Sequence, residues 1–244
     1  MTAIVLAAGK SKRMGSETPK VLIPVEGRPL LGHVLDSVRR AGVERIVVVV
    51  GEGREGVTAE FRDQGLEFAV QAEQKGTADA VLACRDLLAA DEECVVVYGD
   101  VPMMRAETIR RLIRARAERG AEIAVLTAEF DDPFGYGRIV RGEGDVIEDI
   151  VEERDADEAV RQIREVNSGF YAFIWGRLLP VLERVEPSPV SGEYYLTDAV
   201  KGVRAEGGLV VAVRMADPAQ MMGANTPEQL EQVAREMARR AGGR

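Results

Sequence analysis

The chain has 244 residues and a formal net charge of -9, and 46% of its residues are hydrophobic. This length and composition suit a globular protein with a substantial core, built as one large α/β domain or two small ones. The sequence pI is about 4.9 and no basic face follows the first loop, so we expect no nucleic-acid partner.

The N-terminus shows no targeting segment. Met1-Thr2-Ala3 leads directly into an apolar stretch, and no apolar run is long enough to cross a bilayer. We therefore expect a cytoplasmic protein with no membrane partner. Cys84 and Cys94 lie in apolar contexts typical of core residues rather than of a disulfide or a zinc site. His33 lies within a predicted amphipathic helix, so catalysis by a histidine base is not favoured.

Hydrophobic periodicity predicts alternating strands and helices up to residue 130. After the strand that ends near Leu6, apolar residues at helical spacing predict a helix over 29–41, which Gly42 ends. The further predicted elements are a strand at 45–50, a helix at 55–63, strands at 67–71 and 93–98, helices at 77–88 and 106–118, and a strand at 122–130. This βαβ order indicates a parallel sheet with its ligand site at the carboxyl edge of the strands.

The pattern changes beyond Asp131, where long helices no longer separate the strands. Short strands at 137–141, 146–152 and 163–174 predict a small antiparallel or mixed extension that covers the ligand-binding edge. Helices at 175–182 and 196–206, a strand at 209–213 and a helix at 227–240 capped by Thr226 complete the list. We expect one domain over 1–226, followed by a C-terminal helix over 227–244.

The first loop has the composition of an anion-binding site. Ala7, Ala8 and Gly9 carry little or no side chain, so phosphates or a base can approach the backbone closely. The cationic residues that follow are Lys10, Lys12, Arg13 and Lys20. Such clustering in an acidic chain favours a triphosphate site, although a solvated basic loop has the same composition. The loop matches neither G-x-x-x-x-G-K-[ST] nor G-x-G-x-x-G, which disfavours a Rossmann dehydrogenase.

Asp100 follows a predicted strand in the segment Tyr98-Gly99-Asp100-Val101-Pro102. It should therefore emerge at the same edge of the sheet as the first loop. Mg²⁺ takes oxygen ligands, commonly one or two carboxylates completed by water and substrate phosphate. A carboxylate opposite a basic loop suits metal-assisted nucleotidyl transfer, while an ordinary helix cap or turn is the structural alternative.

Gln71 and the pair Gly76-Thr77 flank a predicted strand-to-helix turn. A glutamine amide offers both a donor and an acceptor to the edge of a base, and the helix start offers N–H groups. A capped βα loop without a ligand explains the same residues. Glu152, Asn167 and Asn225 taken singly serve a turn or a cap equally well.

Together these segments resemble the sugar-1-phosphate nucleotidylyltransferases over essentially the whole chain. They are most similar to the N-terminal uridylyltransferase domain of bifunctional N-acetylglucosamine-1-phosphate uridylyltransferases. The motifs that carry the resemblance are Leu6 to Met14 with Pro19-Lys20, Gln71-Ala72-Glu73-Gln74-x-Gly76-Thr77, Tyr98-Gly99-Asp100-Val101-Pro102, Asp132-Pro133-x-Gly135-Tyr136-Gly137-Arg138-Ile139, Ile150-Val151-Glu152, Asn167-x-Gly169, Gly192-Glu193-Tyr194-Tyr195-Leu196-Thr197-Asp198 and Gly223-x-Asn225.

The resemblance implies a Rossmann-like nucleotidyltransferase fold and a Mg²⁺-dependent enzyme. Its substrates would be UTP and N-acetylglucosamine 1-phosphate, whose phosphate attacks the α-phosphorus without a general base. Uracil and ribose would contact Leu6, Ala7, Ala8, Gly9, Gln71, Gly76 and Thr77. Arg13 and Lys20 would hold the triphosphate and stabilise the departing pyrophosphate, and Asp100 and Asn225 would ligate Mg²⁺.

For the sugar, the resemblance implies contacts from Gly137, Glu152 and Asn167, with Glu152 on the hydroxyls and Asn167 near the N-acetyl group. Tyr98 and Gly99, next to Asp100 in their motif, also count among the expected substrate-binding residues.

The chain departs from the bifunctional pattern at three points. It stops after the helix that would connect to a β-helix acetyltransferase domain, so we expect no acetyltransferase activity and leave the oligomeric state open. Asp79 stands where the close family commonly has histidine. Ala224-Asn225-Thr226-Pro227 resembles sugar nucleotidylyltransferases more generally. Glucose 1-phosphate with UTP or dTTP is therefore the alternative substrate pair. A nucleotide-sugar sensor is a non-enzymatic alternative, disfavoured because Arg13, Lys20 and Asp100 are all present.

Overall fold

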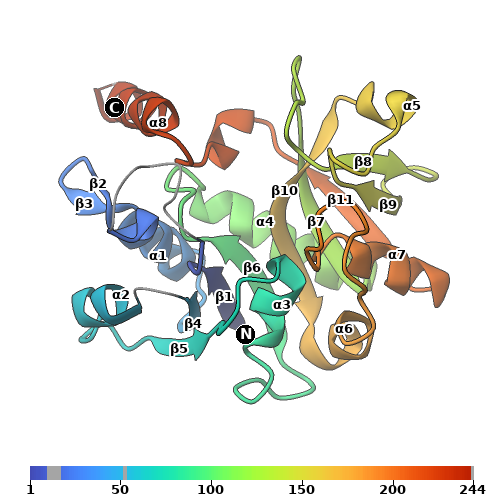
Figure 1. Cartoon of the computed structure of the whole chain (residues 1–244), viewed down its shortest axis with the longest axis horizontal. Helices are drawn as coiled ribbons and strands as arrows, with labels where there is room; N and C mark the ends of the chain where they lie inside the picture. The colour runs from blue at the N-terminus through green and yellow to red at the C-terminus, as the bar shows by residue number, and fades with distance from the viewer. Residues whose placement is uncertain (10–17, 52–53, 243–244) are drawn as a thin grey trace.

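A computed structural model of the chain describes residues 1–9, 18–51 and 54–242. Within these ranges a sheet of nine strands forms the centre of the molecule, and helices cover both of its faces (Figure 1). Its strands are β1 (Thr2–Leu6), β4 (Arg45–Val50), β5 (Glu67–Val70), β6 (Glu93–Tyr98), β7 (Ile123–Glu129), β8 (Arg138–Arg141), β9 (Ile147–Val151), β10 (Glu165–Ile174) and β11 (Val210–Arg214). A separate hairpin pairs β2 (Pro24–Val25) with β3 (Arg28–Pro29).

The helices follow the predicted periodicity in most places. They are α1 (Leu30–Arg40), α2 (Arg54–Glu60), α3 (Thr77–Leu82), α4 (Ala106–Arg119), α5 (Glu158–Arg161), α6 (Trp175–Leu182), α7 (Asp198–Ala205) and α8 (Pro227–Gly242), with 3-10 turns η2 (Lys20–Leu22) and η3 (Pro218–Met221). The helix expected over 77–88 ends at Leu82, and the chain continues in turns in which Cys84 and Leu87 donate to carbonyls three residues back. The hairpin, both 3-10 turns and α5 were not predicted.

The strand order places the ends of β1 and β6 side by side. The order is β11-β7-β10-β6-β1-β4-β5, and β1 runs parallel to both of its neighbours. Leu6 lies opposite Val49 on one side and Tyr98 on the other. The chain moves from β1 outward to β4 and β5 and then returns to the other side of β1. Ligands bind at such a reversal of strand order, because the loops there diverge and leave a crevice.

The mostly parallel sheet was expected, but the position of β10 was not. The strand predicted over 163–174 was assigned to the small extension, whereas β10 lies inside the main sheet, antiparallel to both β6 and β7. Tyr171 and Phe173 are buried within it. Only its beginning joins the extension, where Val166 pairs with Arg138 of β8. Alternating hydrophobicity shows that a segment is a strand, but it carries no information about the strand's neighbours.

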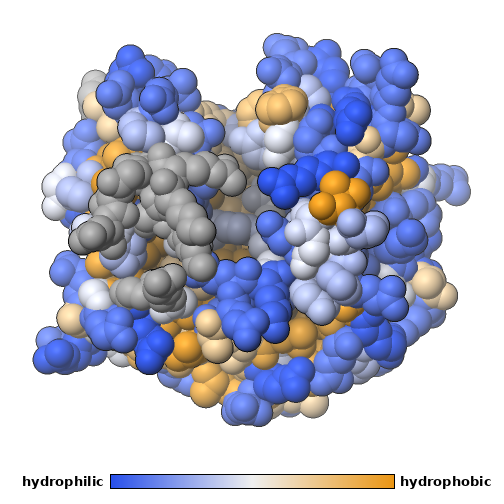
Figure 2. All heavy atoms as spheres, in the orientation of Figure 1, coloured by the Kyte–Doolittle hydropathy of each residue, from blue (hydrophilic) through white to orange (hydrophobic). Residues whose placement is uncertain are grey.

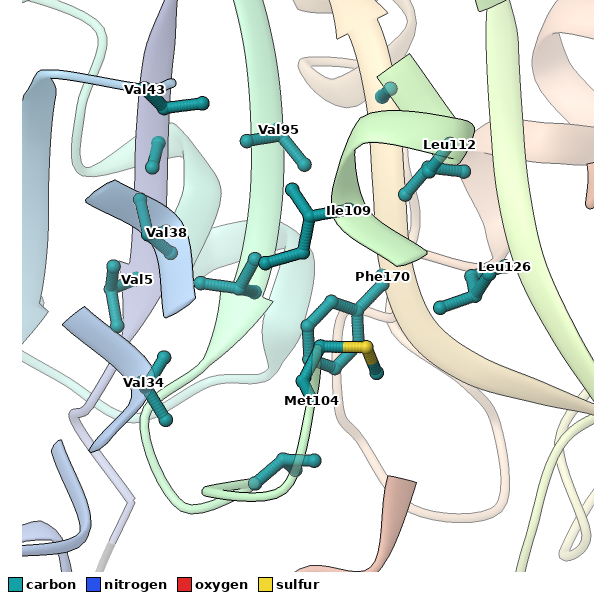
Figure 3. Packing of buried hydrophobic residues seen from close by; sticks show 14 of the residues in the cluster. Val5, Val34, Val38, Val43, Val95, Met104, Ile109, Leu112, Leu126 and Phe170 are labelled. Carbon is teal, nitrogen blue, oxygen red and sulfur yellow. The ribbon is translucent and has the colours of Figure 1, made fainter. Parts of the chain in front are cut away.

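Two layers of packed side chains hold the helices on the sheet. Val34 and Val38 of α1, with Ile109 and Leu112 of α4, pack on one face over residues such as Val95 (Figure 3). On the other face, residues of α3, α6 and α7 pack against the alternate side chains of the same strands. Since β-strand side chains alternate between faces, a strand buried on both faces needs a continuous apolar sequence. The apolar run 46–50 in β4 meets that requirement.

The two cysteines, His33 and Thr226 have the structural roles that the sequence predicts for them. Cys84 and Cys94 are buried free thiols, and burial raises the pKa of each to about 12. His33 Nε2 lies 2.9 Å from the carbonyl oxygen of Val25 and so tethers α1 to the hairpin. The backbone N–H of Gln229 donates to Thr226 Oγ1 at 3.2 Å, so Thr226 caps α8. No helix in the described part of the chain is long and apolar enough to span a membrane.

Candidate active site

A pocket of about 290 Å³ lies at the carboxyl ends of β1 and β6. In the space-filling view the upper edge of the molecule is notched between the part carrying α8 and the arm carrying β8 and β9 (Figure 2). The pocket is lined by Leu6, Ala7, Ala8, Gly9, Lys20, Val21, Gln71, Gln74, Gly76, Thr77, Ala80, Tyr98, Asp100, Glu193 and Asn225. Most residues expected to bind the nucleotide therefore share one cavity.

The small residues after β1 form one wall of this pocket. Ala7 and Ala8 are 8% and 7% exposed, and Gly9 is exposed. The side-chain amide of Gln74 donates to the carbonyl oxygen of Ala8, which holds this backbone in place. Arg13, predicted to hold the triphosphate, lies outside the described residues.

Lys20, Asp100 and Asn225 converge at the base of the pocket. Lys20 Nζ forms an ion pair with Asp100 Oδ2 and donates to Asn225 Oδ1 at 2.7 Å. The Lys20 and Asp100 side chains are 13% and 11% exposed. These residues come from η2, from the turn after β6 and from the turn before α8, so only the folded chain brings them together.

The same two oxygen atoms have the chemistry of a Mg²⁺ site. A carboxylate and an amide carbonyl are hard ligands, and water and substrate phosphate commonly complete the shell of Mg²⁺. The ammonium of Lys20 already lies between them, which shows that a cation fits electrostatically at this point. The residues present therefore fit the expected metal.

Gln71 and Thr77 line the pocket with part of their hydrogen-bonding capacity already used. Gln71 is 6% exposed, and its amide N–H₂ donates to Gly76 O at 3.0 Å and to Asp79 Oδ2 at 2.8 Å. Thr77 Oγ1 accepts from the backbone N–H of Leu196 at 2.9 Å. The hydroxyl of Thr77 thus fixes a neighbouring loop while it lines the cavity.

Gly76 allows that loop to close over the pocket. Its φ is +129°, and a Cβ at this position would collide with the backbone of Tyr194. Tyr194 N donates to Lys75 O at 2.7 Å, and Tyr194 O accepts from Ala78 N at 3.0 Å. The resulting contact carries the neighbouring Glu193 to the cavity wall. Glu193 and Gln74 were not predicted as site residues, although both lie within the motifs that carry the family resemblance.

A second pocket of about 230 Å³ adjoins the first. It is lined by Tyr98, Asp100, Val101, Gly135, Tyr136, Gly137, Glu152, Asn167, Ser168, Gly169, Met221, Gly223 and Asn225. Three of these residues, Tyr98, Asp100 and Asn225, also line the first pocket. The residues expected to bind a sugar thus surround one chamber, which meets the nucleotide chamber at the candidate metal ligands.

Local structure orients the polar side chains of this second pocket. A register shift between Asn167 and Tyr171 interrupts β10 at the site, and Asn167 Oδ1 accepts from Gly169 N at 2.9 Å. Gly169 has a φ of +81°, and a side chain there would collide with the Tyr98 ring. Burial raises the pKa of Tyr98 far above its usual value, so its hydroxyl remains protonated. An irregular strand therefore presents Asn167 and leaves space for Tyr98.

Glu152 is the acidic group of the second pocket. Thr197 Oγ1 donates to Glu152 Oε1 at 3.0 Å. Burial, reinforced by the nearby carboxylates of Asp198 and Asp155, raises the pKa of Glu152. A carboxylate can accept hydrogen bonds from the hydroxyl groups of a ligand. Gly137 lies against it, with a virtual Cβ 3.4 Å from both carboxylate oxygens, so a side chain at Gly137 would crowd the chamber.

Not every predicted residue lies at a cavity wall. Gly99 lines neither pocket, and its N–H donates to Leu6 O at 2.9 Å. Its missing side chain instead allows Val21 to approach the strand end, with a virtual Cβ 3.3 Å from Val21 Cγ1. A wider cavity of about 930 Å³ lies on the other side of Glu152, beside α7. The lining of that cavity includes none of Lys20, Asp100 and Asn225.

Comparison with protein families identifies the family of this chain. The family described as the MobA-like NTP transferase domain matches residues 3–188. The chain belongs to this family. It is therefore an enzyme of the nucleotidyltransferase type, as the resemblance of its motifs implied.

Bifunctional GlmU proteins are among its similar relatives. The protein from Heliobacterium modesticaldum is 44% identical over 94% of this chain and 50% of its own length. The protein from Syntrophotalea carbinolica is 43% identical over 98% of this chain and 52% of its own length. The chain thus spans about half the length of the curated relatives it matches. These matches confirm the resemblance between the motifs of this chain and those of bifunctional uridylyltransferases.

Solved structures confirm the fold class. A UDP-glucose pyrophosphorylase complexed with UDP-glucose superposes with a TM-score of 0.77 at 17% identity, covering 98% of both chains. A putative glucose-1-phosphate thymidylyltransferase from Bacillus anthracis gives the same TM-score at 21% identity, covering 98% of this chain and 95% of the other. At these identities the likeness concerns the fold alone.

Proposed function

We propose that this protein transfers UMP from UTP to N-acetylglucosamine 1-phosphate, giving UDP-N-acetylglucosamine and pyrophosphate. The observation that carries the proposal is the junction of two pockets at Asp100, Asn225 and Tyr98. Nucleotidyl transfer needs one chamber for each substrate and a charged point where the two phosphates meet. The similarity to bifunctional GlmU proteins supports this substrate pair.

Positioning and neutralisation of charge account for the reaction. An oxygen of the sugar 1-phosphate attacks the α-phosphorus, and the bond from that phosphorus to the bridging oxygen breaks as pyrophosphate leaves with the electron pair. The nucleophile is already an anion, so no general base is needed. Lys20 lines the first pocket near its junction with the second and would stabilise the charge of the reacting phosphates with its ammonium.

Asp100 and Asn225 would hold Mg²⁺ through the oxygens that contact Lys20. When bound, the ion neutralises phosphate charge and aligns the two substrates. Glu152 and Asn167 would orient the sugar through its hydroxyl and N-acetyl groups, since both line the second pocket. Leu6 to Gly9, with Gln71 and Thr77, would hold uracil and ribose against the backbone.

A matrix of pyrophosphate-release assays tests the proposal. UTP and dTTP are each paired with N-acetylglucosamine 1-phosphate and with glucose 1-phosphate, in the presence of Mg²⁺. The proposal expects the highest kcat/KM for UTP with N-acetylglucosamine 1-phosphate. A higher value for glucose 1-phosphate would support the alternative substrate pair and overturn the sugar assignment. Nucleotide binding without pyrophosphate release from any pair would contradict uridylyl transfer altogether.

A further inference from the structure

Asp79 makes a contact that the proposed reaction does not use. It lies in the first turn of α3, and its Oδ2 accepts a hydrogen bond from Gln71 Nε2 at 2.8 Å. Its side chain makes no other hydrogen bond or ion pair in the described part of the chain. The same nitrogen of Gln71 donates to Gly76 O at 3.0 Å.

These two contacts determine which way the Gln71 amide faces. A backbone carbonyl and an ionised carboxylate only accept hydrogen bonds, so both must face the N–H₂ end of the amide. Turning the amide by half a turn would place its oxygen against two acceptors. The two N–H bonds are therefore used internally, and the Oε1 atom is left for a ligand.

Gln71 Oε1 has no partner within residues 1–9, 18–51 and 54–242. The residue is 6% exposed and lies in the wall of the nucleotide pocket. An acceptor at a cavity wall with no protein donor is open to a donor from a ligand. The two internal contacts thus fix the amide, and Oε1 is the atom of its polar end that remains for a ligand.

We infer that Asp79 is a specificity-determining positioning residue, which holds Gln71 so that the pocket selects pyrimidines with an imide N–H. Uracil and thymine carry this donor at N3, whereas N3 of cytosine is an acceptor and would face Gln71 Oε1 without a proton. The inference rests on the proposed function and deepens it. It predicts discrimination against CTP but none between UTP and dTTP through this contact.

The test compares UTP with CTP in Asp79→Ala. Without the carboxylate, Gln71 gains the freedom to turn and donate its N–H to cytosine N3. The ratio of kcat/KM for UTP to that for CTP should fall about tenfold, while KM for the sugar phosphate stays unchanged. Asp86→Ala is the matched control, because Asp86 is an exposed carboxylate shortly after α3, and it should keep the wild-type ratio.

Asp79→Asn supplies a rescue, because its side-chain carbonyl can still accept from Gln71; it should largely restore the preference for UTP. An unchanged UTP-to-CTP ratio in Asp79→Ala, including an equal loss of kcat/KM with both nucleotides, would overturn the inference. Failure of Asp79→Asn to restore the ratio would overturn it as well. Calorimetric binding of UDP and CDP gives the same comparison without turnover. If the wild type bound UDP over CDP and Asp79→Ala lost that preference, the inference would hold even where the assay matrix rejected uridylyl transfer.

Discussion

The ammonium of Lys20 and the carboxylate of Asp100 form an ion pair at the junction of the nucleotide and sugar pockets. Asp100 is also the residue proposed to ligate Mg²⁺. A metal ion held by Asp100 and Asn225 would therefore compete with Lys20 for the same oxygens, and Lys20 would then be free to contact the phosphates.

Replacing Lys20 by methionine should separate its two effects. Lys20→Met removes the cation that competes for Asp100 and Asn225, so these residues should bind Mn²⁺ about tenfold more tightly in the absence of nucleotide. Turnover should nevertheless fall by about a hundredfold or more, because the phosphates lose a positive charge. Metal titration followed by calorimetry or by electron paramagnetic resonance measures the first effect. Lys201→Met, at an exposed lysine, should change neither quantity. Weaker metal binding in Lys20→Met would contradict this competition.

Removing the Asp100 carboxylate should abolish most activity without unfolding the protein. Asp100→Ala takes away the acidic candidate ligand of the metal, and we expect turnover to fall by about a hundredfold or more. The loss of one partner of a mostly buried ion pair lowers stability as well, so the urea unfolding curve must be recorded beside the assay. Asp63→Ala, at an exposed carboxylate, is the control. Near-normal pyrophosphate release from a folded Asp100→Ala protein would reject the metal role.

Gly76 should tolerate no side chain. Gly76→Ala places a methyl group against the Tyr194 backbone at a φ of +129°, and we expect the free energy of unfolding to fall by about 2 to 4 kcal/mol. Gly65→Ala is a matched control, because Gly65 also has a positive φ, +66°, but faces open space. Its cost should stay near 1 kcal/mol. Equal losses in the two variants, measured by urea denaturation, would show that contact with Tyr194 contributes nothing.

Glu152 should make stability depend on pH in a predictable direction. Its pKa is raised in the folded protein, mainly by burial, so the folded state holds this proton more tightly than the unfolded state. The stability due to the protonated group is complete below the unfolded pKa of about 4.5 and is lost as pH rises through the raised value. Glu152→Gln keeps the acceptor for Thr197 but cannot ionise. Relative to wild type, the variant should therefore gain stability as the pH rises above the unfolded pKa of about 4.5. A difference that does not change with pH would contradict the burial of an ionisable Glu152.

Strands and helices whose hydrophobic residues form a clear local pattern were predicted correctly. The strands at 45–50 and 93–98 and the helix at 175–182 agree with the structure to the residue. The β2–β3 hairpin escaped prediction because two-residue strands show no periodicity. The helix expected over 77–88 stops at Leu82, although the apolar pattern continues into the turns beyond it. Apolar spacing records which side chains are buried, and a chain of short turns can bury them in the same way.

The sequence by itself determined the chemistry available to this protein: small residues after the first strand, clustered cations, Asp100 after an apolar strand, and a set of motifs specific enough to indicate the family. Only the tertiary structure decided which of these groups meet. Lys20, Asp100 and Asn225 converge although Lys20 and Asn225 lie 205 positions apart in the chain. The orientation of Gln71 depends on two acceptors that fix its amide, and Gly99 serves packing instead of lining a pocket. Residue types record chemical capacity, whereas distance and direction follow from the packing of the whole chain, and no local pattern contains them.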